Sequence, residues 1–170
     1  GIYCKGLMID GISVTFDPGI YHIWGDFHFT NNAQASGDGV TFILKGTNNR
    51  LLIENGAEVN LRAPSTGQTA GLVFWQKYLD FIPYIFGRIP DSPDRVIATS
   101  EIASGAGLNI IGTAYLPDHE IMISSENRVS SKSPATSFIA RQIHFTEKAN
   151  MVVRVDHEEG GVPPIQPRSD

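Results

Sequence analysis

Cysteine, long apolar runs and clustered charge are all scarce in this chain of 170 residues. Its single cysteine, Cys4, excludes an internal disulfide and is equally compatible with an oxidising or a reducing compartment. The longest apolar stretch, around residues 78–86, is interrupted by Asp80 and Pro83 and falls short of the roughly 18 residues that a membrane-spanning helix needs. Charged residues make up only 18% of the chain, and its 13 basic residues form no cluster, so we expect no nucleic-acid partner.

What the chain does contain points to one domain with many turns. Hydrophobic residues reach 41%, which is enough for one continuous core in a chain of this length. Seventeen glycines and ten prolines are spread along the chain, and Ser, Thr and Asn are common, as on extracellular proteins. The chain begins at Gly1 without Met, so we expect a longer precursor with an export signal or anchor upstream.

An imperfect repeat of roughly twenty residues runs along the chain. Each repeat starts at a glycine followed by apolar or aromatic residues, and two further short strands follow at similar offsets in the first three repeats. The starts are 1–3, 19–21, 39–42, 71–74 and 112–115; the second strands are 7–9, 27–29 and 51–53; the third are 14–16, 33–35 and 59–61. Three short strands separated by Gly, Asn, Asp or Pro turns describe one triangular rung of a β-solenoid.

Alternation along these strands predicts which side chains point inward. Phe27, Phe29 and Ile53 are expected inside, whereas Met8 and His28 are expected outside in matching positions. We therefore predict an all-β fold, a short right-handed parallel β-helix of about five to six rungs. A sandwich of hairpins also suits short strands, but two-residue hairpin turn signals are scarce and the repeats align in parallel order.

Two stretches depart from the repeat. We predict a β-helix domain over residues 1–155 that carries one long insert at 76–107, since loops of that length in compact domains are usually functional or mobile. Residues 156–170 contain Gly160, Gly161 and three prolines and are interpreted as a linker or an unfolded tail.

The repeat phrases resemble the C-terminal region of TadG-like proteins of bacterial tight-adherence (Flp) pilus assembly. The matching phrases are Pro18-Gly19-Ile20-Tyr21, Gly37-Asp38-Gly39-Val40-Thr41-Phe42, Leu61-Arg62-Ala63-Pro64, Ala70-Gly71-Leu72-Val73-Phe74 and Ile111-Gly112-Thr113-Ala114-Tyr115-Leu116-Pro117, and their order covers most of residues 1–150. The resemblance implies a membrane anchor upstream, export to the periplasm or cell surface, and pilus-assembly or cell-envelope partners. It implies no enzymatic activity.

Catalytic and metal-binding patterns are weak, and no cofactor is expected. No nucleophile elbow marks a serine. His22 and His28 flank Asp26, but alternation already explains them as outward-facing surface residues. A turn holding Asp118, His119 and Glu120, and a second group at 156–159, offer too few closely spaced ligands for a structural metal site.

A carbohydrate-binding or polysaccharide-cleaving β-helix is the alternative function, because lyases and glycosidases also use this fold. Such enzymes need paired carboxylates or acids that hold calcium. The acids at turns, Asp10, Asp26, Glu54 and Glu58, show no close pairing in the sequence.

The insert is the most specific candidate for binding. Tyr78, Phe81, Tyr84 and Phe86, with Arg88 and Arg95 nearby, are predicted either to form an exposed aromatic patch for sugar or protein, or to cover a side of the solenoid or mediate self-association. The first rung begins at Gly1, so we expect sequence upstream of it to cap its open edge, and the domain without that sequence to self-associate through this edge.

Overall fold

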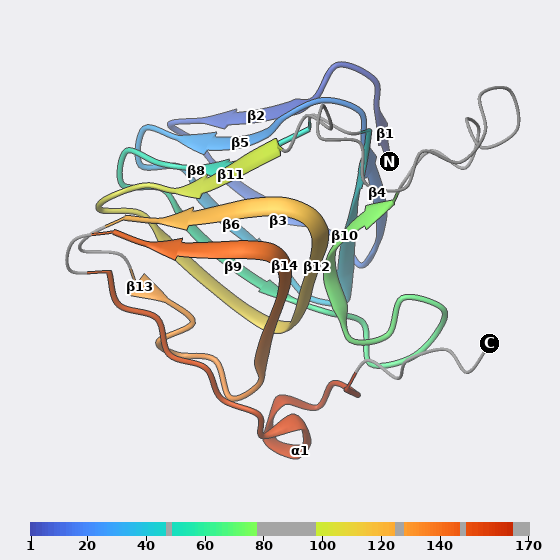
Figure 1. Cartoon of the computed structure of the whole chain (residues 1–170). Helices are drawn as coiled ribbons and strands as arrows, with labels where there is room; N and C mark the ends of the chain where they lie inside the picture. Colours follow the sequence, from blue (N-terminus) through green and yellow to red (C-terminus); the bar gives the residue numbers. More distant parts are fainter. Residues whose placement is uncertain (47–48, 78–97, 125–127, 147–148, 165–170) are drawn as a thin grey trace, which may run out of the picture.

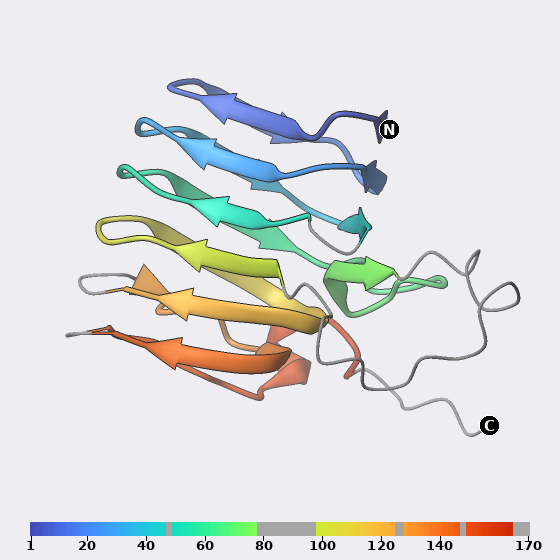
Figure 2. The ribbon, with the colours of Figure 1, turned by 45° about the horizontal axis from the view of Figure 1, so that its top comes forward.

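The fold is a parallel β-solenoid, as predicted. In the computed structural model, 58% of the chain is strand and 3% is helix, and the strands form about five turns. The structure describes residues 1–46, 49–77, 98–124, 128–146 and 149–164. Successive turns stack one below another from the N-terminal end, and each encloses a triangular interior (Figures 1 and 2).

Three faces surround this interior. Face 1 consists of β1 (Ile2–Tyr3), β4 (Gly19–Ile23), β7 (Val40–Lys45), β10 (Leu72–Lys77), the middle of β12 (Gly107–Ile123) and the first half of β14 (Thr136–Phe145). Face 2 consists of β2 (Leu7–Asp10), β5 (Phe27–Thr30), β8 (Leu51–Ile53), β11 (Ala98–Ile102) and the C-terminal parts of β12 and β14. Face 3 consists of β3 (Ser13–Phe16), β6 (Gln34–Gly37), β9 (Glu58–Arg62), the N-terminal part of β12 and β13 (Arg128–Val129).

Columns of like-positioned side chains fill the interior. On face 2, Ile9, Phe29, Ile53, Ile102 and Ile123 lie one below another by ladder register, and each is at most 4% exposed. The predicted alternation is confirmed, because the intervening Met8 is 61% exposed. Burying such apolar columns supplies most of the driving force for folding.

Aromatic rings concentrate in the N-terminal half of the core. The ring of Phe42 lies 4.8 Å from that of Phe27, 4.9 Å from that of Phe16 and 5.8 Å from that of Phe74, measured between ring centroids. These separations suit tilted and edge-to-face aromatic pairs, which add to the energy of burial. Towards the C-terminal end the fully buried large hydrophobic side chains are aliphatic, as at Leu108 and Ile110.

The corner between faces 2 and 3 is a repeated tight turn. The N–H groups of Ala33, Ala57 and Ala106 each donate to the carbonyl three residues earlier, and all three alanines are fully buried. The turns place Asn31, Asn32 and Asn55 at positive φ, a conformation that asparagine tolerates better than most residues. The asparagines thus set the sharp bend from which β6 and β9 start.

The predicted insert is too long at both ends. Strand β10 continues through Lys77, in register with β7. Strand β11, at Ala98–Ile102, is a regular member of face 2 between β8 and β12. Its polar sequence resembles a loop, but Ala98, Ser100 and Ile102 point inward and are buried. Residues 78–97 lie outside the described residues.

Residues 156–164 are not an unfolded tail, contrary to the prediction. A short helix, α1 (His157–Gly160), begins at Asp156, whose carboxylate accepts the N–H of Glu159 at 2.9 Å. Arg62 on β9 donates from Nη2 to the carbonyl of Gly160 at 2.5 Å, and Val162 is 2% exposed. We call this contact the Arg62–Gly160 clasp. Among the described residues, no helix is long and apolar enough to cross a membrane.

Candidate functional site

The outer surface of face 3 is a ladder of uncharged polar side chains. Ladder register places Thr15, Ser36, Asn60 and Asn109 in one row. The hydroxyl oxygens of Thr15 and Ser36 lie 3.2 Å apart, and Asn109 donates from Nδ2 to Oδ1 of Asn60 at 3.2 Å. The row therefore presents oriented donors and acceptors on a rigid sheet, which is favourable for recognition of a polar ligand.

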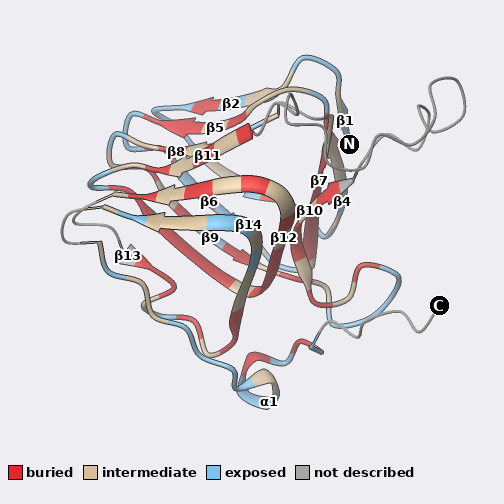
Figure 3. Cartoon of the chain, in the orientation of Figure 1, coloured by how far each residue is buried: buried red, intermediate tan, exposed pale blue. Residues whose placement is uncertain are grey.

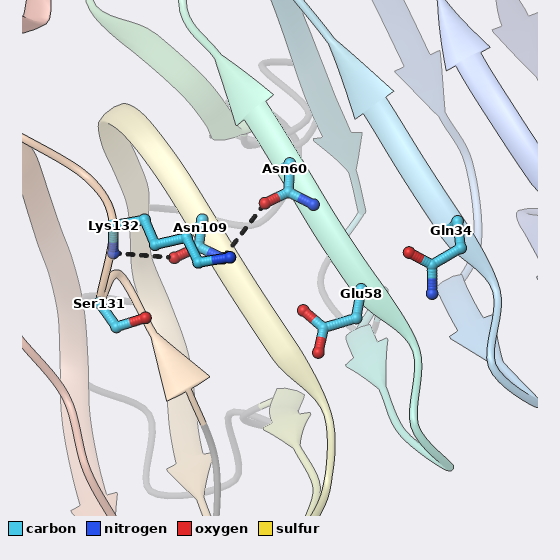
Figure 4. A pocket seen from close by; sticks show the side chains of 6 residues that line it. All are labelled: Gln34, Glu58, Asn60, Asn109, Ser131 and Lys132. Carbon is cyan, nitrogen blue, oxygen red and sulfur yellow. Dashed lines mark hydrogen bonds between the residues drawn. The ribbon is translucent and has the colours of Figure 1, made fainter.

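A turn over this ladder converts it into a groove. The turn at residues 130–133 places Lys132 next to Asn109, whose Oδ1 accepts the Lys132 N–H at 3.3 Å. Arg154 holds the turn by donating to the carbonyls of Ser131 and Ser133 at 3.0 and 3.3 Å. Figure 4 shows the resulting groove from close by. Its volume is about 220 Å³, and its lining residues are Gln34, Glu58, Asn60, Asn109, Ser131 and Lys132.

A second hollow of about 250 Å³ adjoins the first and shares Asn60, Asn109 and Lys132 with it. It adds Asp38 and Arg62, whose Oδ1 and Nε atoms lie 3.8 Å apart. We call the two hollows together the face 3 groove. Together the two hollows are lined by two acids, Glu58 and Asp38, and two bases, Lys132 and Arg62, so the groove has no strong charge of either sign.

The carboxylate of Glu58 lies across the neighbouring strand, at Gly107. A side chain at Gly107 would overlap this carboxylate, so glycine keeps the floor of the groove open. Among the described residues, Glu58 is the carboxylate that lines the first hollow, and Asp38 lines the adjoining one.

The predicted acid and histidine group around residues 22–28 is divided between separate ion pairs. His28 on β5 lies 2.9 Å from Glu54, between Nε2 and Oε1, and Arg50 lies 2.5 Å from Asp26, between Nη2 and Oδ2. Burial alone would raise the pKa of Asp26, but the hydrogen bonds and charge of Arg50 outweigh it and hold that pKa below its usual value. Among the described residues, no three His, Cys, Asp or Glu side chains are grouped to hold a metal ion.

His119 does not lie in an exposed turn, contrary to the prediction. Strand β12 continues past Pro117, and the imidazole of His119 points into the solenoid with no exposed surface. Its Nδ1 lies 2.7 Å from Oγ of Ser100, which also accepts the Leu51 N–H at 3.0 Å. Burial lowers the pKa of His119 to about 4, although the nearby charge of Asp118 acts in the opposite direction.

Gln76 is a further buried polar side chain, and it is hydrogen-bonded to the residue next to His119. Gln76 is 4% exposed and accepts the Asp118 N–H at Oε1, at 2.9 Å. Equivalent positions in neighbouring rungs are apolar, as at Leu44 above Gln76. Gln76, Ser100 and His119 are all buried, so we assign them a structural role.

No protein-family model, curated protein or solved structure matches this chain. Function is therefore inferred from the faces and side-chain clusters described above.

The remaining predicted sites have different outcomes. The aromatic group Tyr78, Phe81, Tyr84 and Phe86, with Arg88, lies outside the described residues, as does Arg95. The acidic group at 156–159 forms helix α1 and its N-cap.

The face 3 groove was not predicted as a site. Its signal in the sequence was the run of outward Gln and Asn residues on successive third strands, exemplified by Gln34 and Asn60. These Gln and Asn residues did not indicate that the turn at residues 130–133 would cover face 3.

Proposed function

We propose that this chain is a non-catalytic structural or interaction module of the bacterial periplasm or cell surface, associated with Flp pilus assembly. The association rests on the resemblance of its repeat phrases to TadG-like proteins. The observation that supports a binding role is the face 3 groove, where a rigid ladder of amide and hydroxyl groups lies under a covering turn.

The proposed association with pilus assembly is tested in the source bacterium. Deleting the coding gene is expected to reduce piliation and surface adherence, and the intact gene supplied in trans should restore both. Unchanged pili in electron micrographs together with unchanged adherence would contradict the association.

A carbohydrate ligand is the second candidate, and the lining of the groove favours it. Asparagine and glutamine amides both donate and accept hydrogen bonds, as do sugar hydroxyls. The balanced charges of Glu58 and Lys132 in the first hollow favour a neutral glycan over a strongly acidic one.

Replacing Asn60 with alanine is expected to weaken binding of a neutral oligosaccharide about tenfold, because each lost neutral hydrogen bond is worth roughly 0.5–1.5 kcal/mol. Thr15→Ala is the matched control, since Thr15 lies in the same row outside the groove. Ligands are first identified on an array of neutral and acidic oligosaccharides, and affinities are then measured by calorimetry. Equal affinities of both variants, or binding confined to acidic glycans, would contradict this ligand class. Sustained cleavage of any polysaccharide would contradict the non-catalytic proposal.

A further inference from the structure

Exposed apolar side chains concentrate at the two ends of the solenoid. Among the described residues, nine large hydrophobic side chains are exposed, and seven of them lie on the first or the last rung. These are Ile2, Met8 and Ile12 on the first rung, and Ile139, Phe145, Val153 and Val155 on the last. Figure 3 shows the same contrast on face 2, since β2 and β14 are mostly intermediate or exposed while β5, β8 and β11 between them are largely buried.

Among the described strands, those of the first and last rungs have a strand neighbour on one side. Strands β1, β2 and β3 pair with β4, β5 and β6, and β14 pairs with β12. The outer edges therefore leave backbone N–H and C=O groups available to another parallel strand. At the start of β14 the edge is already occupied, because the Thr136 N–H donates to the carbonyl of Arg154 at 2.7 Å and Ala135 pairs with Val155. The edge considered below is therefore that of residues 137–145.

The side chains at the two ends belong to the same columns. On face 1 the outer column runs from Ile2 through His22, Ile43, Trp75 and Tyr115 to Ile139. On face 2 the inner column runs from Ile9 through Phe29, Ile53, Ile102 and Ile123 to Phe145. A first rung placed below a last rung in the same register would therefore continue both columns with apolar contacts.

We propose that copies of this chain associate head to tail, with the first rung of one copy stacked on the last rung of the next. Ile2 of one copy then packs on Ile139 of its neighbour, and Ile9 packs on Phe145. The contact is a further repetition of the rung-on-rung stacking that holds each molecule together, which is why we assign the ends to a second copy. Because the two joined surfaces differ, the association does not close on itself, and it extends into a filament.

One corner of this contact carries like charges. Lys5 follows β1, and Arg141 lies within β14 at the corresponding corner between faces 1 and 2; both are exposed. Their repulsion is screened by salt. Association is therefore expected to strengthen as ionic strength rises, and Lys5→Glu is expected to strengthen it at low salt.

Sedimentation velocity over a range of concentrations up to millimolar, with electron microscopy of the concentrated samples, tests the proposal. Ile139→Lys is expected to weaken association at least about tenfold, because it places a charge in an apolar contact. Ile20→Lys is the matched control, since Ile20 is 41% exposed and Ile139 is 42% exposed, and Ile20 belongs to the second rung. Circular dichroism of each variant verifies that it is folded.

Mixing two variants determines the polarity of the contact. Ile2→Lys retains an intact last rung and Ile139→Lys retains an intact first rung, so their mixture should form a one-to-one dimer while neither assembles alone. Association that Ile2→Lys abolishes and Ile139→Lys leaves unchanged would show a head-to-head contact and overturn the proposal. A wild-type chain that remains monomeric at millimolar concentration and high salt would also overturn it.

Discussion

Replacing Phe29 with aspartate is expected to abolish folding. Phe29 has no exposed surface, and its ring centroid lies 4.5 Å from that of Phe27. Truncating a buried phenylalanine costs about 3–5 kcal/mol, and an unpaired buried carboxylate costs several more. The sum is comparable to the entire stability of a domain, roughly 5–15 kcal/mol. Far-ultraviolet circular dichroism and urea titration of the variant measure the effect.

Ser13→Asp is the control for this variant, because Ser13 is an exposed strand residue on face 3. It is expected to change the free energy of unfolding by no more than about 0.5 kcal/mol. Ile53→Asp should behave as Phe29→Asp does, since Ile53 lies directly below Phe29 in the same column. Cooperative unfolding of a soluble Phe29→Asp protein would show that this column is not the core.

Acidification is expected to destabilise the fold through His119. In the unfolded chain a histidine takes up its proton near pH 6.5, whereas buried His119 does so only near pH 4. Between these values the unfolded state binds more protons, so stability falls as pH falls through this window. The separation corresponds to a loss of about 3 kcal/mol in the free energy of unfolding.

Urea titrations at several pH values measure this slope, and His119→Leu is expected to remove most of it between pH 6.5 and 4. The lowered pKa of Asp26 gives a separate loss of stability, which occurs as pH falls below 3.8, the ordinary pKa of an aspartate. Retention of the full slope in His119→Leu would show that other groups carry the acid sensitivity.

The repeated core was predictable from the sequence because its signals are local. Alternation at residues 27–29 and 51–53 and a glycine at the start of five of the six strands of face 1 are visible within a few residues of chain. Parallel stacking then follows from the repetition of these segments in the same order, and the structure places Phe27 and Leu51 in one column as expected.

Strand β11 and the buried histidine were missed because their environments are made by distant residues. Ser100 occupies an inward position that is Leu51 in the rung above, and a serine there is tolerated because it bonds to His119, 19 residues later. The residues adjacent to Ser100 and to His119 in the sequence give no sign of this hydrogen bond. The polar strand was therefore predicted as part of a loop, and the buried histidine was predicted to lie in a turn.

The face 3 groove depends on a similar long-range contact. Its floor was foreseeable from the outward position of Asn60, but the overhanging turn is held by Arg154, more than twenty residues away in the chain. The tail was misread for the same reason, since the partner of Gly160 is Arg62, 98 residues earlier.

That clasp also gives the solenoid unequal resistance to force at its two ends. In a stack where each rung contacts only its neighbours, tension applied to one terminus peels rungs away one at a time. At the N-terminal end β1 is held by β4 alone, so peeling meets only the ladder between adjacent rungs. At the other end, traction on residues 161–164 reaches the Arg62–Gly160 clasp first and is shared with β9, near the middle of the stack. The Arg62–Gly160 clasp must therefore break before the last rung can separate from the stack.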